Sequence, residues 1–218
     1  MSQWPIIWER LKLLAYTAPA ILAAIVFHEM AHGWASYWLG DPTPKEDGRL
    51  SIAPWKHLDP VGILCMILFH FGWARPVQVR PQYYKNPKLG MAVTAVAGPL
   101  ANFLLAFAAS GLYVWMFKAD LRGSVFLNTT VGAYLMELVG FLVSINIGLG
   151  VFNLIPIPPL DGAKVLGAVL PERLYFRIMP YERYGTILLV ALLYIGVLDG
   201  PLGTARAWLI DTMFSVWL

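Results

Sequence analysis

The chain has 218 residues, of which 58% are hydrophobic and 13% are charged, and its mean hydropathy is +0.62. Soluble domains are roughly a quarter charged, so this composition excludes an ordinary soluble protein and predicts an integral membrane protein. The net charge of +3 comes from basic residues in short loops between apolar segments, which argues against nucleic-acid binding. No repeat or low-complexity tract divides the chain, and we expect one membrane-embedded domain over residues 1–218.

Three apolar segments are long enough to cross a bilayer as helices, which takes about 20 residues. These segments are residues 13–40, 89–117 and 138–160. A fourth, 184–198, is shorter and crosses only if Arg183 and Asp199 reach the two interfaces. Segments 60–74 and 207–218 are shorter than a full span, which leaves them re-entrant, interfacial or spanning. The sequence therefore predicts an all-α polytopic membrane protein with a three-span core and accessory helices.

The first span contains the stretch IVFHEMAHGW, residues 25–34, with three polar side chains inside an apolar run. His28 and His32 are four residues apart, so a helix places both imidazoles on one face, where they can bind one zinc ion. Glu29 lies beside the first histidine and can act as the general base for a water on that zinc. Polar groups at this depth cost several kcal/mol and are functional by default, which favours a metal site over chance.

A catalytic zinc needs a third protein ligand. The metzincin pattern requires a histidine six residues after His32, but that residue is Trp38, so that family is excluded. The remaining candidates are Glu46, His57, His70, Asp161 and Asp199. The second span crosses back and the third returns, which delivers Asp161 to the same side of the membrane as the two histidines. Asp199, at the far end of the next span, should face the other side.

The sequence around Asp161 is NLIPIPPLDG, residues 153–162. Its three prolines cannot continue a regular helix, so the chain should unwind beside a protein-lined cavity. The alternative is that the helix ends normally at the interface and Asp161 caps the next helix.

Three motifs, FHEMAHGW, AGPLAN (residues 97–102) and NLIPIPPLDG, occur in the order seen in site-2 proteases, the intramembrane zinc metalloproteases. The chain resembles that family over its three core spans, roughly half its length. The segment FGWARPV, residues 71–77, is similar to the small prokaryotic-type branch without an inserted PDZ domain.

The resemblance implies that zinc is held by His28, His32 and Asp161 and that Glu29 is the catalytic base. It places Asn102 and Asn153 near the active site. There the amides would bind substrate or support the oxyanion, unless they serve only as hydrogen bonds between helices.

The expected activity is hydrolysis of a peptide bond in or near a transmembrane segment of another membrane protein. The substrate helix must unwind locally, because its own hydrogen bonds shield a helical amide. The alternative from another class is a zinc-binding transporter or channel, which would also carry histidines and carboxylates within the membrane.

Two further expectations concern the stretch between the first two spans. Residues 41–88 must start and finish on one side of the membrane, so 60–74 is not a lone crossing. The loop 75–88 is basic with no acid, and the positive-inside rule makes that side cytoplasmic, in a prokaryotic cell membrane. Residues 76–80, PVQVR, alternate in polarity and predict a short strand beside the zinc cavity, with a free edge for an unwound substrate.

Overall fold

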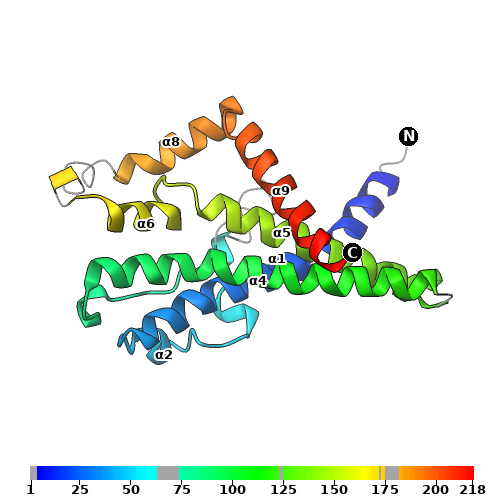
Figure 1. Cartoon of the computed structure of the whole chain (residues 1–218), viewed down its shortest axis with the longest axis horizontal. Helices are drawn as coiled ribbons and strands as arrows, with labels where there is room; N and C mark the ends of the chain where they lie inside the picture. The colour runs from blue at the N-terminus through cyan, green and yellow to red at the C-terminus, as the bar shows by residue number, and fades with distance from the viewer. Residues whose placement is uncertain (1–3, 63–73, 123–124, 172, 175–181) are drawn as a thin grey trace.

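The computed structural model describes residues 4–62, 74–122, 125–171, 173–174 and 182–218. Within these residues every regular element is a helix, which confirms the all-α prediction (Figure 1). The three longest are α1 (Trp4–Trp38), α4 (Pro87–Leu121) and α5 (Thr130–Asn153). Each contains a segment long and apolar enough to cross a membrane, so the protein is a multi-pass membrane protein.

The shorter elements follow the long ones along the chain. They are α2 (Thr43–Glu46), η1 (Pro54–Lys56), η2 (Pro81–Tyr83), η3 (Phe126–Asn128), α6 (Asp161–Val169), α8 (Glu182–Ile195) and α9 (Asp199–Trp217).

The third span differs from its predicted bounds of 138–160. The helix α5 begins at Thr130, where the Thr129 side chain accepts a hydrogen bond from the Gly132 amide and caps it. It ends at Asn153 because Pro156, three residues later, cannot continue a helix.

Helices α4 and α5 pack side by side, and α9 lies across both of them (Figure 1). Small residues permit the close approach. A methyl group added at Gly150 of α5 would lie 2.6 Å from the Phe103 ring of α4, and one at Gly111 of α4 would lie 2.9 Å from the Trp217 ring of α9. The shared apolar cluster consists of Ala106, Ala109, Met116, Val139, Val143, Ile147 and Met213.

The connection between α1 and α4 begins and ends at one place. The hydroxyls of Ser36 and Tyr84 lie 2.7 Å apart, and the Arg80 amide donates to the Asp41 carboxylate at 2.7 Å. Within this connection, an isolated antiparallel bridge joins Leu58 to Ala74. The two ends of the stretch between those residues therefore lie together. Most of the predicted segment 60–74 lies outside the described residues, since these omit 63–73.

The strand predicted at 76–80 is wrong. The structure assigns no strand to this segment, because its backbone donors pair with side chains of α1 and of the turn after it. The Val77 amide donates to Glu29 at 3.1 Å, and the Arg80 amide donates to Asp41. Without a ladder partner in the described part of the chain, no sheet edge is established. The position beside the active-site cavity was nevertheless predicted correctly, since Pro76, Val77 and Val79 line that cavity.

The segment 184–198 does not form a crossing that ends at Asp199. Helix α8 stops at Ile195, and α9 continues at an angle of 83° to it, across a turn in which Gly196 has φ +79°. Helix α9 then passes along α5 to the end of α4, where Lys118 Nζ donates to the Trp217 carbonyl at 2.8 Å. The bent pair is apolar enough for one further span. Asp199 consequently lies at the bend between α8 and α9, and its predicted place at the far interface stays a prediction. Segment 207–218 is the second half of α9.

Candidate active site

Three polar side chains from two helices meet at one point. His28 and His32 project from one face of α1, and Asp161 is the first residue of α6. His28 Nε2 lies 3.2 Å and His32 Nε2 lies 3.1 Å from Asp161 Oδ2, and the two Nε2 atoms are 3.0 Å apart. All three residues are buried, with at most 8% of their surface exposed.

The partners of the opposite ring nitrogens fix both imidazole tautomers. His32 Nδ1 lies 2.7 Å from the Thr94 carbonyl, which only accepts, so this nitrogen carries the hydrogen. His28 Nδ1 lies 2.7 Å from Asn102 Oδ1, which is also an acceptor, so it carries the hydrogen too. In the neutral rings, both Nε2 atoms therefore direct lone pairs toward Asp161.

This arrangement fits a metal cation. Three acceptor atoms facing one another at about 3 Å repel unless positive charge lies between them. Tetrahedral zinc with ligand bonds of about 2.0–2.1 Å separates its ligand atoms by about 3.3 Å, close to the spacing observed here. The residues present thus match a zinc site with three protein ligands and an open fourth position.

Local chain geometry presents Asp161 to the histidines. After α5 ends, the proline-rich turn folds back so closely that a methyl group on Gly162 would lie 2.3 Å from the Leu154 carbonyl oxygen. The cap position of α6 is Leu160, with no side-chain hydrogen bond, so the alternative role of Asp161 as a helix cap is not observed. The sequence feature responsible is the Pro-rich run followed by glycine.

The charge state of Asp161 suits a metal ligand. Burial alone would raise the pKa of this carboxyl group, and the positive charge of the Lys164 ammonium acts in the opposite direction. Lys164 Nζ lies 3.0 Å from Asp161 Oδ1 and leaves Oδ2 directed at the imidazoles. The carboxylate is therefore anionic at neutral pH, the form that binds metal.

Glu29 lies beside this group, in a cavity of about 160 Å³ that also contains Asn153, Met91 and Pro159. Its Oε2 accepts a hydrogen bond from the Val77 amide at 3.1 Å. The carboxylate is thus oriented by the backbone of the 76–80 segment, while it shares a cavity with all three candidate ligands.

The two asparagines predicted near the site occupy different positions. Asn102 is fully buried behind His28, and its Nδ2 donates to the Ala24 carbonyl and to Asn146 Oδ1, at 3.0 and 2.8 Å. Both amide hydrogens are used, so none remains for an oxyanion. Asn153 lines the cavity itself and donates to the Leu149 carbonyl one turn earlier.

The other candidate ligands are not brought to this point. His57 is buried in the loop before 60–74 and lies 2.6 Å from the Ser51 carbonyl through Nε2. Glu46 is exposed in α2, Asp199 lies at the α8–α9 bend, and His70 is outside the described residues.

Sequence reasoning missed three contributors. Asn146 was detectable as an amide side chain within an apolar span. A methyl group at Gly98 would lie 2.4 Å from His32 Nε2, so this glycine leaves room for the ligands. Thr94 acts through its carbonyl, which no side-chain pattern reveals.

A comparison with protein families agrees with this geometry. The model described as Peptidase family M50 matches residues 16–198, most of the chain. The chain belongs to peptidase family M50. This M50 peptidase is a membrane zinc metalloprotease, as the resemblance to site-2 proteases predicted, and the transporter or channel alternative is set aside.

Curated relatives bear names of the same kind. "Putative zinc metalloprotease YwhC" of Bacillus subtilis is 32% identical over 198 residues, which cover 91% of this chain and 86% of the relative. "Putative zinc metalloprotease Rip2" of Mycolicibacterium smegmatis is 26% identical, covering 87% of this chain and 71% of the relative. Its Mycobacterium tuberculosis namesake is 24% identical, covering 93% and 78%. No solved structure matches the chain.

Proposed function

We propose that this M50 peptidase hydrolyses peptide bonds in or near transmembrane segments of other membrane proteins. The observation that carries the proposal is the position of the site. His28, His32 and Asp161 converge at the end of three apolar helices, and Glu29 shares their cavity. A scissile bond that reaches this point must belong to a chain lying in the membrane or at its surface.

In this proposal His28, His32 and Asp161 hold the zinc ion. Bound zinc supplies Lewis acidity, which polarises a carbonyl and lowers the pKa of a water. Glu29 accepts the proton of the attacking water and donates it to the leaving amine. The Val77 amide holds Oε2 of Glu29, which leaves Oε1 to carry the proton.

The two asparagines take different roles. Asn102 positions His28, because its Oδ1 fixes the ring tautomer and its amide hydrogens are both donated elsewhere. Asn153 lines the cavity and binds the backbone of the unwound substrate.

The charge distribution supports an active site on the cytoplasmic side of a prokaryotic cell membrane. Arg75, Arg80 and Lys85 lie in the connection that enters α4, and Lys88 lies in its first turn, at the end of the helices where the site is found.

The test replaces Glu29 with glutamine, which keeps the size of the side chain and removes its ability to take a proton. We expect one zinc per protein, as in the wild type. Cleavage of a single-span probe in detergent should fall about 10²-fold or more, the scale of general-base loss. Glu46→Gln, at an exposed carboxylate of α2, is the matched control and should cleave normally. Wild-type cleavage by the Glu29→Gln protein would exclude Glu29 as the base.

A further inference from the structure

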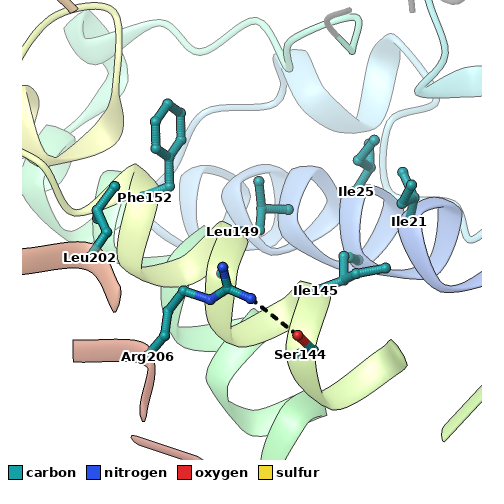
Figure 2. A pocket seen from close by; sticks show the side chains of 10 residues that line it. Ile21, Ile25, Ser144, Ile145, Leu149, Phe152, Leu202 and Arg206 are labelled. Carbon is teal, nitrogen blue, oxygen red and sulfur yellow. Dashed lines mark hydrogen bonds between the residues drawn. The ribbon is translucent and has the colours of Figure 1, made fainter. Parts of the chain in front are cut away.

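A second, larger cavity of about 480 Å³ lies between α1, α5 and α9 (Figure 2). Apolar side chains form most of its wall. They are Ile21, Ala24, Ile25, Ile145, Leu149, Phe152 and Leu202. We call this cavity the α1–α5 groove.

One cation enters the α1–α5 groove. Arg206 projects from α9, and its Nη2 donates to Ser144 Oγ at 3.1 Å, as Figure 2 shows. A methyl group on Gly148 would lie 3.6 Å from Nε, so the glycine leaves room for the guanidinium. Among the described residues, no carboxylate lies within 4 Å of Arg206, and Ser144 accepts its one hydrogen bond although guanidinium has five donors.

The depth of Arg206 makes this unpaired charge unusual. Ser144 lies nine residues before the end of α5 and 14 residues after its start. At 1.5 Å per residue, these separations are about 13 and 21 Å, which places the guanidinium near the middle of a hydrocarbon layer about 30 Å thick. An ionised side chain at this depth is costly and marks a functional contact with an opposite charge.

The α1–α5 groove leads to the active site. Ile21 and Ile25 continue, at helical spacing, the face of α1 that carries His28 and His32. On the opposite wall, Phe152 lines the groove and its neighbour Asn153 lines the catalytic cavity. A chain lying in the groove would therefore reach the candidate ligands directly.

We propose that the α1–α5 groove binds the transmembrane helix of the substrate and that Arg206 pairs with an aspartate or glutamate on that helix. This inference rests on the proposed function and adds a specificity determinant to it. The Arg206 side chain lies beside Ser144 and Gly148 of α5. These two residues precede Asn153 by nine and five positions of the same helix. The acidic residue therefore lies up to about nine residues from the cleaved bond, and nearer where the substrate is unwound.

A lipid phosphate has the negative charge that Arg206 requires, but it does not lie at the depth of Arg206 in the bilayer. Headgroup phosphates lie outside the hydrocarbon layer, about 15 Å or more from its centre. A carboxylate on a membrane-spanning helix can occupy the middle of the bilayer, where Arg206 lies.

Binding tests the proposal without requiring catalysis. The Glu29→Gln protein is placed in phosphatidylcholine vesicles with a labelled single-span Leu/Ala helix that carries one Asp or one Asn at successive positions. We expect the Asp helix to bind about tenfold more tightly at the matching position, a factor that corresponds to ~1.4 kcal/mol. Arg206→Gln, added to this protein, should bring the Asp-to-Asn ratio to about one. Arg206→Glu should prefer the same helix with Lys, a reversal that a purely structural role of Arg206 cannot produce.

The matched control is Arg122→Gln, which removes an exposed arginine at the opposite end of α4 and should keep the Asp preference. Equal binding of Asp and Asn helices by the parent protein would overturn the proposal. The proposal would also be overturned if Arg206→Gln changed helix binding only in vesicles that contain phosphatidylglycerol, because the arginine would then bind a lipid. Cleavage by the Glu29-containing protein is scored separately. If the protein cleaves the helices but binds Asp and Asn helices equally, only the role of the α1–α5 groove is refuted. If it prefers the Asp helix but cleaves neither, only the proposed function is refuted.

Discussion

At the scale of single residues, the candidate centre joins groups that are far apart in the chain. His32 and Asp161 are separated by 129 positions, yet their ligating atoms lie 3.1 Å apart. Each atom directs a lone pair at the others because hydrogen bonds on the far side of both imidazoles hold the ring hydrogens away. Such a cluster is stable only around a cation, so metal binding and folding of this region should be coupled.

Replacement of Asp161 by asparagine, compared with the same change at Asp199, tests which aspartate is the third zinc ligand. The amide cannot supply an anionic oxygen, so we expect zinc content and cleavage both to fall. Asp199→Asn should change neither. Asp199 is the other aspartate in an Asp-Gly pair that follows leucine, but it lies at the α8–α9 bend, outside the ligand group. Metal analysis of purified proteins decides between them, and loss of zinc from Asp199→Asn alone would reverse our assignment.

The two asparagines make a second residue-scale test. Asn102→Leu removes the acceptor that fixes the His28 tautomer, and we expect zinc affinity to fall about 10–100-fold, the usual cost of losing such a partner. Asn153→Leu is the comparison, since this side chain lines the cavity without touching an imidazole. It should retain zinc and lose cleavage. Competition with a chelator measures affinity, and equal affinities in the two variants would contradict the positioning role of Asn102.

At the scale of elements, the extended connection before α4 contributes to the site through the positions of its backbone amides and not through regular secondary structure. Residues 76–80 form no strand, but two of their amides are held by carboxylates of Glu29 and Asp41. The Asp41 carboxylate also accepts from the Ser36 hydroxyl, which ties the segment to the end of α1. The connection therefore forms one wall of the catalytic cavity and orients the candidate base.

Val77→Pro tests that role, because proline removes the amide hydrogen that Glu29 accepts. A hydrogen bond to a charged group contributes about 1.5–3 kcal/mol, so cleavage should fall about tenfold or more while zinc remains bound. Val77→Ala keeps the amide and should retain most of the activity. If the two variants cleave equally, the hydrogen bond does not orient Glu29.

At the scale of the whole molecule, three apolar helices and a bent helix pair enclose polar groups that would be costly in lipid. The arrangement requires α1 and α5 to run in the same direction, so that the ends carrying His32 and Asn153 meet at one side (Figure 1). The α4 helix runs in the opposite direction between them and supplies Thr94, Gly98 and Asn102 along its length.

The proposed cytoplasmic orientation of the site predicts which positions are accessible from the cytoplasm. In Cys65→Ala proteins with one new cysteine, Ser51→Cys and Gln82→Cys should both react with a membrane-impermeant thiol reagent from the cytoplasmic face. Arg122→Cys, at the far end of α4, should react from the other face. The reason is that the connection between α1 and α4 closes on itself at Asp41 and Arg80. Labelling of Ser51 and Gln82 variants from opposite faces would refute the arrangement.

The sequence by itself determined features that depend on neighbouring residues. Hydropathy located the three core spans, and the four-residue spacing placed His28 and His32 on one helix face. Pro156 indicated that the third helix could not continue to Asp161. These are local properties, because helix period, apolar run length and proline geometry act within a few turns. Counting the membrane crossings also selected Asp161 as the third candidate ligand. Each crossing is predicted from a local apolar segment, so the side of the membrane that the chain reaches follows from local properties.

Only the tertiary structure decided what depends on distant contacts. The bend of 83° between α8 and α9 was not predicted, although Gly196, with φ +79°, is the residue type that permits such a turn. The predicted strand at 76–80 failed because carboxylates from elsewhere in the chain took its amides. The placement of Arg206 beside Ser144, 62 positions away, also has no local signature. Packing brings such pairs together, and hydropathy and spacing carry no information about which buried faces will meet.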